Sequence, residues 1–220
     1  MLALSLELST AHASLALFQD EELIGESAWL EPSARKAHLF EELPALFNRT
    51  GVEAAAIHTF VVGRGPGSYS GLRSAITAAR ALALPGGRAV YAVSSGEALA
   101  VETARREGGR AVAVVGNARR SMLWIGVYRI HGAGLEVMKP WTVMRAAELG
   151  EVLREPCTVV SPDWTQLKPS LTDQGLAHVR WIEEDRYPSA KEVGRLGLMK
   201  LGANHPSEAL TPIYTHPPVG

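Results

Sequence analysis

Short apolar runs divided by polar turns open the chain. The runs cover residues 2–8, 13–18 and 22–29, and only a few polar residues separate one from the next. Connections this short form hairpins rather than crossovers, so the spacing predicts three antiparallel strands. An apolar, β-branched run at 59–62 and another at 89–93 predict two further strands, both buried.

A helix is expected over residues 34–50, because Pro32 and Ser33 form a start signal and Gly51 forms a stop signal. Its apolar side chains recur at helical intervals, but they spread over a wide stripe. The stripe comprises Leu39, Phe40, Leu43, Pro44, Leu46 and Phe47. Two interpretations remain open: a deeply packed helix kinked at its proline, or a helix with a second apolar partner outside its own domain.

A glycine-rich stretch, residues 61–73, reads VVGRGPGSYSGLR. Glycine permits backbone dihedrals that other residues resist, and Pro66 fixes one φ angle. The stretch therefore predicts a strand–loop–helix corner, called the Gly loop below (residues 63–71), followed by a helix over 70–84. One side of that helix is apolar, and the opposite side carries Ser70, Arg73, Thr77 and Arg80.

The capping-box spacing of Ser94 and Glu97 predicts a further helix after the strand at 89–93, and the second half of the chain repeats this order of elements. Strands are expected at 110–115, 122–130, 135–144, 157–160 and 178–182, helices at 145–153 and 189–201, and no assignment is made for 163–171. The repeated order predicts an α/β protein with a duplicated actin-like fold (ASKHA, RNase H-like) of two tandem βββαβαβα units. We expect an N-terminal subdomain over 1–108 and a C-terminal one over 109–220, with the tail 205–220 packing back on the first.

The composition is that of an ordinary folded protein, with 220 residues, 46% apolar and 20% charged. The 22 basic and 23 acidic residues nearly cancel, so no chain-wide basic surface for nucleic acid is indicated. The single Cys157 excludes an intramolecular disulfide and a multi-cysteine zinc site. No apolar run approaches 18 residues, and the first residues of the sequence contain no basic region typical of a signal peptide. We therefore expect a cytoplasmic protein without a membrane span.

In a duplicated actin-like fold the first turn of each half contacts nucleotide, and both turns are poor sites in this chain. The first carries Glu7 and Ser9 but no glycine for close approach of a phosphate, and the second carries Asn117 in the expected acid position. Mg²⁺ prefers hard oxygen ligands, so one carboxylate makes a weak metal site. Arg119 in the second turn can contact an anion, but an exposed arginine also fits a solvated turn.

The Gly loop is not a Walker A sequence and resembles a dinucleotide fingerprint only loosely. Backbone N–H groups of Gly65, Gly67 and Ser68 can still meet a phosphate or carboxylate at the start of the helix. We favour the competing interpretation of a structural corner or a partner-docking element. No two of the seven histidines lie four residues apart on one helix, and His38 with Glu41 and Glu42 fits a solvated helical face better than a metal site. Ser68 and Ser70 have no local His or Asp neighbour, which leaves only a remote triad open, so no catalytic residue and no metal ligand is predicted.

The sequence of the Gly loop to residue 73, GRGPGSYSGLR, resembles the signature of the TsaB (YeaZ) family, Gly-Arg-Gly-Pro-Gly-Ser-Phe-Thr-Gly-Val/Leu-Arg. Shorter matches follow in the family's order. They are Ser9-Thr10, residues 14–17, His38 with Leu43-Pro44, residues 92–94, Asn117-Ala118-Arg119 and Pro212-Ile213-Tyr214. The resemblance spans the whole length and is weak between about 130 and 205.

This resemblance implies a duplicated actin-like fold and a protein that is not a catalyst on its own. Members of the family are scaffold partners of the related TsaD enzyme and act together with the ATPase TsaE. The complex transfers a threonylcarbamoyl group to adenosine 37 of tRNA. By resemblance we expect a homodimer when the chain is alone, indirect contact with tRNA, no cofactor of its own, and ATP with Mg²⁺ only within the complex.

The resemblance also assigns the partner contact to the helices at 34–50 and 70–84. The expected partner-binding residues are Phe40, Leu43, Phe47, Ser70, Arg73, Thr77 and Arg80. Glu7 and Asn117 each stand in place of a family aspartate, and Tyr69-Ser70 stands in place of Phe-Thr, so the chain resembles a diverged member. The alternative function is a nucleotide-dependent actin-like ATPase or kinase, or a peptidase-like enzyme.

Overall fold

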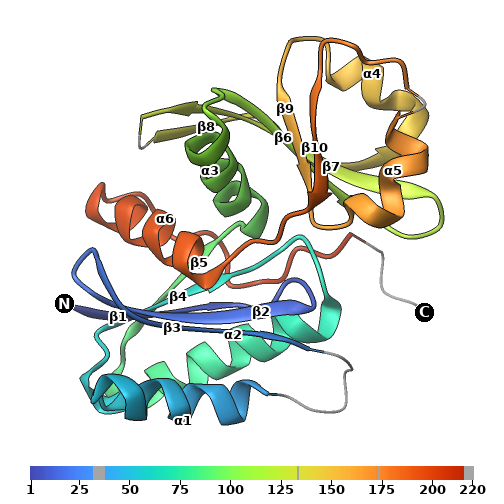
Figure 1. Ribbon diagram of the computed structural model, residues 1–220. Helices are drawn as coiled ribbons and strands as arrows, with labels where there is room; N and C mark the ends of the chain where they lie inside the picture. The colour runs from blue at the N-terminus through green and yellow to red at the C-terminus, as the bar shows by residue number, and fades with distance from the viewer. Residues whose placement is uncertain (32–37, 133, 173, 216–220) are drawn as a thin grey trace. The chain divides into compact units, whose positions relative to one another are not determined.

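Two compact α/β units make up the described part of the chain. The computed structural model describes residues 1–31, 38–132, 134–172 and 174–215 (Figure 1). The first unit comprises residues 1–98 and 188–214, and the second comprises 99–187 with Thr215. Each unit is built on one five-stranded sheet of mixed direction. None of the described helices is long and apolar enough to cross a membrane.

The sheet of the first unit has the strand order β3-β2-β1-β4-β5. Its strands are β1 (Leu2–Glu7), β2 (His12–Gln19), β3 (Glu22–Leu30), β4 (Thr59–Gly63) and β5 (Ala89–Val93). The first three are antiparallel, whereas β4 pairs parallel with β1 and β5 pairs parallel with β4. Every residue of β4 is buried, in agreement with the apolar run of residues 60–62 at its centre. The three antiparallel strands predicted from the short turns are confirmed.

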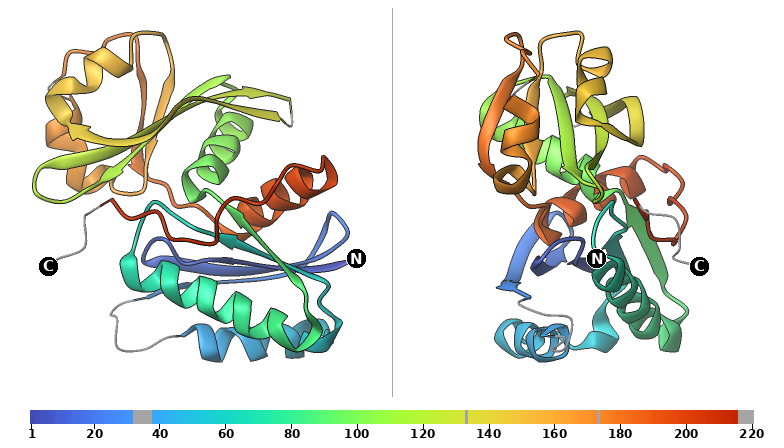
Figure 2. Two further views of the ribbon diagram at one scale, coloured as in Figure 1. Left: turned by 180° about the vertical axis from the view of Figure 1, so that it is seen from behind. Right: turned by 90° about the vertical axis from the view of Figure 1, so that its right-hand side faces the viewer.

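Two helices cover one face of this sheet. α1 (Leu39–Thr50) and α2 (Tyr69–Ala83) lie side by side and run in the same direction (Figures 1 and 2). Leu46 of α1 and Ile76 of α2 join Phe60 of β4 in one buried apolar cluster. The core of the first unit therefore fixes both helices against the sheet and leaves their outer sides to solvent.

The opposite face of the sheet is covered by α6 (Ala190–Gly202), which comes from the far end of the chain (Figure 2). A Cβ atom at Gly194 would overlap the ring of Phe18, and one at Gly197 would overlap the side chain of Val61. The two glycines thus allow α6 to approach the sheet closely, because no side chain separates helix from strand.

This packing divides the chain differently from the expected subdomains 1–108 and 109–220. Residues 188–214, which include most of the expected tail, belong to the first unit. The boundary between the units falls within α3 (Ser95–Glu107), between Ala98 and Leu99. The expected division followed the order of elements along the chain, whereas the last helix of each half packs on the sheet of the other half.

The second unit repeats the layout of the first, with the strand order β10-β9-β6-β7-β8. Its strands are β6 (Ala111–Asn117), β7 (Met122–His131), β8 (Gly134–Arg145), β9 (Thr158–Ser161) and β10 (Arg180–Asp185). Leu99 and Ala100 of α3 pack with Tyr128 in one cluster. α4 (Leu149–Val152) and α5 (Trp164–Thr172) belong to a second cluster. The repeated order of elements is therefore present in both halves.

Some element boundaries differ from the expectation. The helix expected at 145–153 is a 3₁₀ turn followed by the one-turn α4, and the unassigned segment is α5. The start expected for α1 at residue 34 falls among residues 32–37, outside the described part of the chain. α1 continues through Pro44, which is exposed. Neither of the two helices on this face is buried all round, so the interpretation of α1 as a deeply packed helix is not supported.

Candidate functional site

The Gly loop packs backbone to backbone against the turn that follows β1. The Ser68 N–H group donates a hydrogen bond of 2.7 Å to the carbonyl oxygen of Ser9. A Cβ atom at Gly67 would overlap that same oxygen, and one at Gly71 would overlap the carbonyl oxygen of Leu8. Both positions require glycine because a side chain would push the two segments apart.

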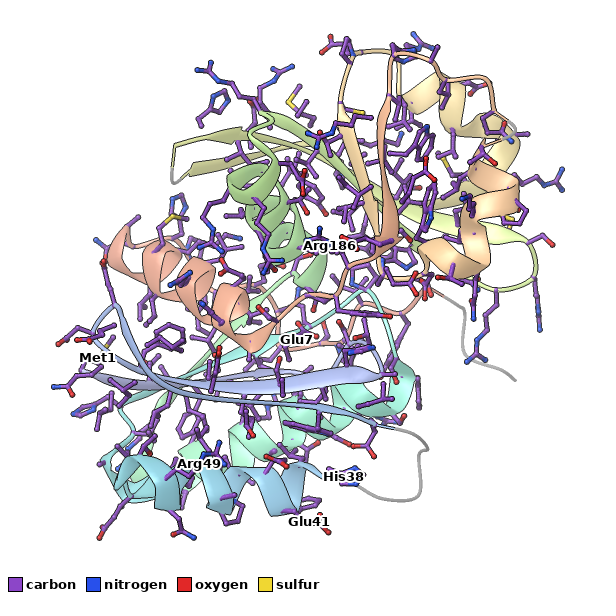
Figure 3. The ribbon with its side chains drawn as sticks, in the orientation of Figure 1. Met1, Glu7, His38, Glu41, Arg49 and Arg186 are labelled. Carbon is purple, nitrogen blue, oxygen red and sulfur yellow. The ribbon has the colours of Figure 1, made fainter. Side chains whose placement is uncertain are left out.

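Glu7, at the end of β1, is fully buried next to the Gly loop (Figure 3). Its Oε1 accepts a hydrogen bond of 2.6 Å from the Ser9 N–H, and its Oε2 accepts one of 2.6 Å from the Ser95 hydroxyl. Burial raises the pKa of the Glu7 carboxyl above its ordinary value, and the hydrogen bonds partly oppose that shift. Both carboxylate oxygens are therefore engaged inside the first unit.

The Gly loop is also bonded to the junction between β5 and α3. The Gly65 N–H donates to the Ser95 hydroxyl at 3.0 Å, and the Ser95 N–H donates back to the Gly65 carbonyl at 2.9 Å. The Ser68 hydroxyl accepts from the Gly71 N–H at 3.3 Å and caps α2. The N–H groups of Gly65 and Ser68 are thus used within the protein. Their role as anion contacts stays a prediction, and these bonds favour a structural corner.

A C-terminal segment, residues 205–214, holds the other side of the Gly loop, and we call it the clasp. The Ile213 N–H donates to the carbonyl oxygen of Arg64 at 2.7 Å. The Arg64 guanidinium pairs with Glu208 at 2.6 Å, and Lys200 of α6 pairs with the same carboxylate at 3.3 Å. All three charged side chains are about a quarter exposed or less. The clasp therefore ties the Gly loop to α6.

The clasp ends in an aromatic contact at the start of α2. The rings of Tyr214 and Tyr69 stack with their centroids 4.8 Å apart. The guanidinium of Arg73 lies 5.0 Å from the centre of the Tyr69 ring, and it also donates a hydrogen bond to the Tyr69 hydroxyl. Sequence reasoning missed this contact, although both tyrosines lie within matched motifs.

The expected partner-binding residues fall into two groups in the structure. The exposed group comprises Phe40, Ser70, Arg73, Thr77 and Arg80. Leu43 and Phe47 are instead half-buried and pack against the core of the first unit. The wide apolar stripe of α1 is thus partly explained by its own sheet, whereas Phe40 is 71% exposed. Leu84, which follows α2, is 80% exposed, and the sequence analysis did not name it as a partner-binding residue. Its position four residues after Arg80 places it on the same side of the predicted helix, and this spacing could have indicated it.

The turn after β6 lies in the second unit, and its polar groups are bonded locally. The Asn117 N–H donates to Asp163 Oδ2 at 2.7 Å, and its side-chain amide donates to Gln166 Oε1 at 2.8 Å. Its side-chain oxygen accepts from the Arg119 N–H at 2.6 Å. Burial raises the pKa of the Asp163 carboxyl. Asn117 therefore shapes its own turn, while the side chain of Arg119 is exposed.

Comparison with known proteins identifies relatives in both sequence and structure. The model of the family described as TsaD, tRNA N6-adenosine threonylcarbamoyltransferase, matches residues 34–155, more than half of the chain. The tRNA threonylcarbamoyladenosine biosynthesis protein TsaB of Bacillus subtilis (strain 168) is 29% identical over 158 residues, which cover 70% of this chain and 67% of that protein.

Among solved structures, YeaZ from Pseudomonas aeruginosa has a TM-score of 0.83 at 22% identity, covering 97% of this chain and 99% of that one. An uncharacterised Pseudomonas aeruginosa protein with similarity to peptidase YEAZ has a TM-score of 0.84 at 21% identity, covering 98% and 99%. Component A of (R)-2-hydroxyglutaryl-CoA dehydratase from Acidaminococcus fermentans is more distant, with a TM-score of 0.51 at 9% identity over 92% and 99%. The duplicated actin-like fold expected from the repeated order of elements is confirmed.

Proposed function

Since the chain belongs to the TsaB (YeaZ) family of tRNA threonylcarbamoyladenosine biosynthesis, we propose that it is a non-catalytic scaffold that binds a TsaD-type catalytic subunit. The proposal includes a TsaE-type ATPase as a further partner, a homodimer when the chain is alone, and indirect contact with tRNA. It places the protein in the cytoplasm with no cofactor of its own, and ATP with Mg²⁺ only within the complex.

The observation that carries the proposal is the outer surface of α1 and α2. Phe40, Tyr69 and Leu84 are each more than half exposed on or beside these helices. Exposed apolar patches mark protein contact surfaces, and tyrosine and arginine are among the residues that dominate the binding energy at interfaces. Arg73 and Arg80 supply such arginines on α2.

The interior of the Gly loop supports a scaffold rather than a catalyst. Both oxygens of the Glu7 carboxylate accept hydrogen bonds from within the first unit. The amide groups of Gly65 and Ser68 are also bonded internally. Because the Glu7 carboxylate and these two amide groups form hydrogen bonds within the protein, we infer that they position α2 and do not contact a substrate.

A binding and reconstitution experiment tests the proposal. The purified chain is mixed with the TsaD-type protein of the same organism, and the complex is measured by calorimetry and by light scattering after gel filtration. The modified nucleoside in tRNA is then quantified by mass spectrometry with and without this chain. We expect a complex and a dependence of the modification on this chain. Absence of a complex, together with equal modification when the chain is omitted, would refute the proposal.

Phe40→Asp locates the contact. A charge at an interface hot spot costs about 2 kcal/mol or more, which raises the Kd for the partner about 30-fold. Met138→Asp on β8 is the matched control, because Met138 is 45% exposed and lies in the second unit. Phe47→Asp is a poorer probe, since Phe47 packs against the core and its loss also destabilises the unit. An unchanged Kd for Phe40→Asp contradicts a contact at α1.

The alternative of an ATPase or kinase predicts that the isolated chain binds and turns over Mg-ATP. Under the scaffold proposal, calorimetry of the isolated chain with Mg-ATP gives no saturable heat. Saturable binding with turnover would establish the enzyme instead.

A further inference from the structure

Three arginines gather at one end of the sheet of the second unit. Arg119 and Arg120 lie in the turn between β6 and β7, and Arg145 is the last residue of β8. Arg145 pairs across the sheet with Met122, the first residue of β7, so β8 ends beside this turn. The side chains of all three arginines are exposed. We call Arg119, Arg120 and Arg145 the arginine cluster.

The turn holds its two arginines in an uncommon backbone conformation. Arg119, Arg120 and Ser121 have φ angles of 58°, 48° and 61°, in the left-handed region that residues other than glycine seldom adopt. Two hydrogen bonds of 2.9 Å close the turn, from the Ala118 N–H to the Met122 carbonyl oxygen and from the Met122 N–H to the Arg119 carbonyl oxygen. Both guanidinium groups therefore project from a closed, hydrogen-bonded turn.

The arginine cluster forms no salt bridge with any described residue, whereas Arg129 of β7 pairs with Glu155. Two acids near the cluster are bonded to backbone groups. Glu148 Oε2 accepts from the Arg145 N–H at 2.9 Å, and Asp163 Oδ2 accepts from the Asn117 N–H at 2.7 Å. Three guanidinium groups beside these two carboxylates leave a net positive charge at this end of the sheet.

The residue that begins the turn adds no negative charge. The side-chain oxygen of Asn117 accepts a hydrogen bond of 2.6 Å from the Arg119 N–H. An aspartate, which the TsaB family has at this position, could accept the same bond but would place a carboxylate beside Arg119. With asparagine, the turn keeps its hydrogen bond and the arginine cluster keeps its charge, which is available to an anionic partner.

We propose that the arginine cluster contacts the phosphate backbone of the tRNA that the catalytic subunit holds, an inference that rests on the proposed function. Guanidinium groups bind phosphate oxygens through paired N–H donors. Three such contacts give only a weak, salt-dependent attraction, so the tRNA is still recruited indirectly, through the TsaD-type subunit. The cluster adds affinity once the RNA is in place. Because the contact is to phosphate, it does not depend on base sequence.

A protein is a less suitable occupant of this surface. Protein interfaces are centred on large apolar or aromatic side chains that become buried. Among the exposed large apolar side chains, Val143 is the one nearest to Arg145 along the chain, and it is only 36% exposed. Contact with a phosphate backbone needs positive charge alone. A free nucleotide has the same phosphate chemistry as RNA, and the experiment below separates these two sources.

The test measures the Kd of labelled tRNA for the complex of this chain with the TsaD-type protein of the same organism, over a series of salt concentrations. Arg119→Gln/Arg120→Gln removes two charges from the turn, Arg145→Gln removes the third, and Arg119→Lys/Arg120→Lys retains the charge. Arg110→Gln/Arg154→Gln is the control of equal charge. Both control arginines are exposed and lie in the second unit, and Arg110 precedes β6, whereas the turn follows it. Circular dichroism checks folding, and calorimetry measures binding of each variant to the TsaD-type protein and to Mg-ATP.

We expect Arg119→Gln/Arg120→Gln to raise the Kd for tRNA about tenfold at low salt and to reduce the slope of log Kd against log salt by about 1.5, since each phosphate contact contributes about 0.7–0.9 to that slope. Arg145→Gln should reduce the slope by about 0.8, and the lysine pair and the control should leave the Kd within about twofold. An unchanged slope in the glutamine pair, while the complex forms and binds tRNA, overturns this inference alone. Absence of the complex overturns the proposed function and this inference with it. A glutamine pair that weakens only binding of the TsaD-type protein, or only binding of Mg-ATP, assigns the cluster to that occupant and also overturns the inference.

Discussion

The substitution Gly71→Ala distinguishes two contributions to stability, because helix propensity predicts that it stabilises α2 whereas packing predicts that it destabilises the first unit. Gly71 lies in the first turn of α2, where its N–H donates to the Ser68 hydroxyl. Considered as a helical position alone, alanine should stabilise it by up to about 1 kcal/mol relative to glycine. In the structure, however, the added Cβ atom would lie 2.0 Å from the carbonyl oxygen of Leu8. Cβ atoms in real proteins essentially never come within 3.0 Å of such an atom.

The steric cost is expected to exceed the gain in propensity. The Leu8 carbonyl belongs to the turn after a central strand, so it cannot move as the end of a flexible side chain can. Forcing extra volume into a packed region costs typically about 1–3 kcal/mol, and the rigid neighbour favours the upper end. With about 1 kcal/mol recovered from propensity, Gly71→Ala should lower the free energy of unfolding of the first unit by about 2 kcal/mol.

Hydrogen exchange followed by mass spectrometry measures this change for each unit separately. Peptides from β1 and α2 should exchange about 30-fold faster in Gly71→Ala, while peptides from the second unit should not change. Gly202→Ala is the matched control, because a Cβ atom at this position, the last residue of α6, meets nothing within 4 Å. If the β1 and α2 peptides of Gly71→Ala exchange as slowly as those of the wild-type protein, or more slowly, Gly71 does not pack closely against the Leu8 carbonyl oxygen and the reasoning is refuted.

Two further predictions concern the charged groups around the Gly loop. Because burial holds the pKa of Glu7 above its ordinary value of 4.5, this carboxyl contributes stability below pH 4.5, and the contribution is lost as the pH rises through the folded pKa. Glu7→Gln should therefore flatten the fall in melting temperature above pH 4.5, and a profile parallel to that of the wild type contradicts the shift. Glu208→Ala removes the partner that Arg64 and Lys200 share, so exchange of the Gly loop amides should rise by about tenfold, corresponding to about 1–2 kcal/mol. Glu155→Ala, which breaks a pair whose carboxylate is 79% exposed, is its control and should have no measurable effect.

The sequence was most informative where neighbouring residues decide the structure. Short connections between the first three apolar runs allow only hairpins, and these strands are antiparallel as predicted. The glycines at 63–71 predicted a corner between a strand and a helix, and β4 and α2 meet there. Both results follow from backbone sterics and loop length, which act over a few residues.

The same reasoning was weaker where residues far apart in sequence meet. The sheet covers only part of the wide apolar stripe of α1. Phe47 is half-buried against the core, whereas Phe40 is exposed to solvent. Periodicity gives the face of a helix but not the extent of the surface that covers it. The tail 205–220 was expected to pack back on the first subdomain, and residues 205–214 do lie in the first unit. The contacts that hold the clasp, such as the pair of Arg64 with Glu208, were not predicted, because its polar residues have no regular period.

By itself, then, the sequence determined the order of the elements, the duplicated α/β fold and the corner at the Gly loop, because local sterics and apolar periodicity encode them. Only the tertiary structure decided that the last helix of each half packs on the sheet of the other half. Only the structure also gave the reason for the glycines: Gly67 and Gly71 face the carbonyl oxygens of Ser9 and Leu8, about sixty residues earlier in the chain. Such contacts depend on which surfaces meet after folding, and no pattern within one segment specifies its distant neighbour.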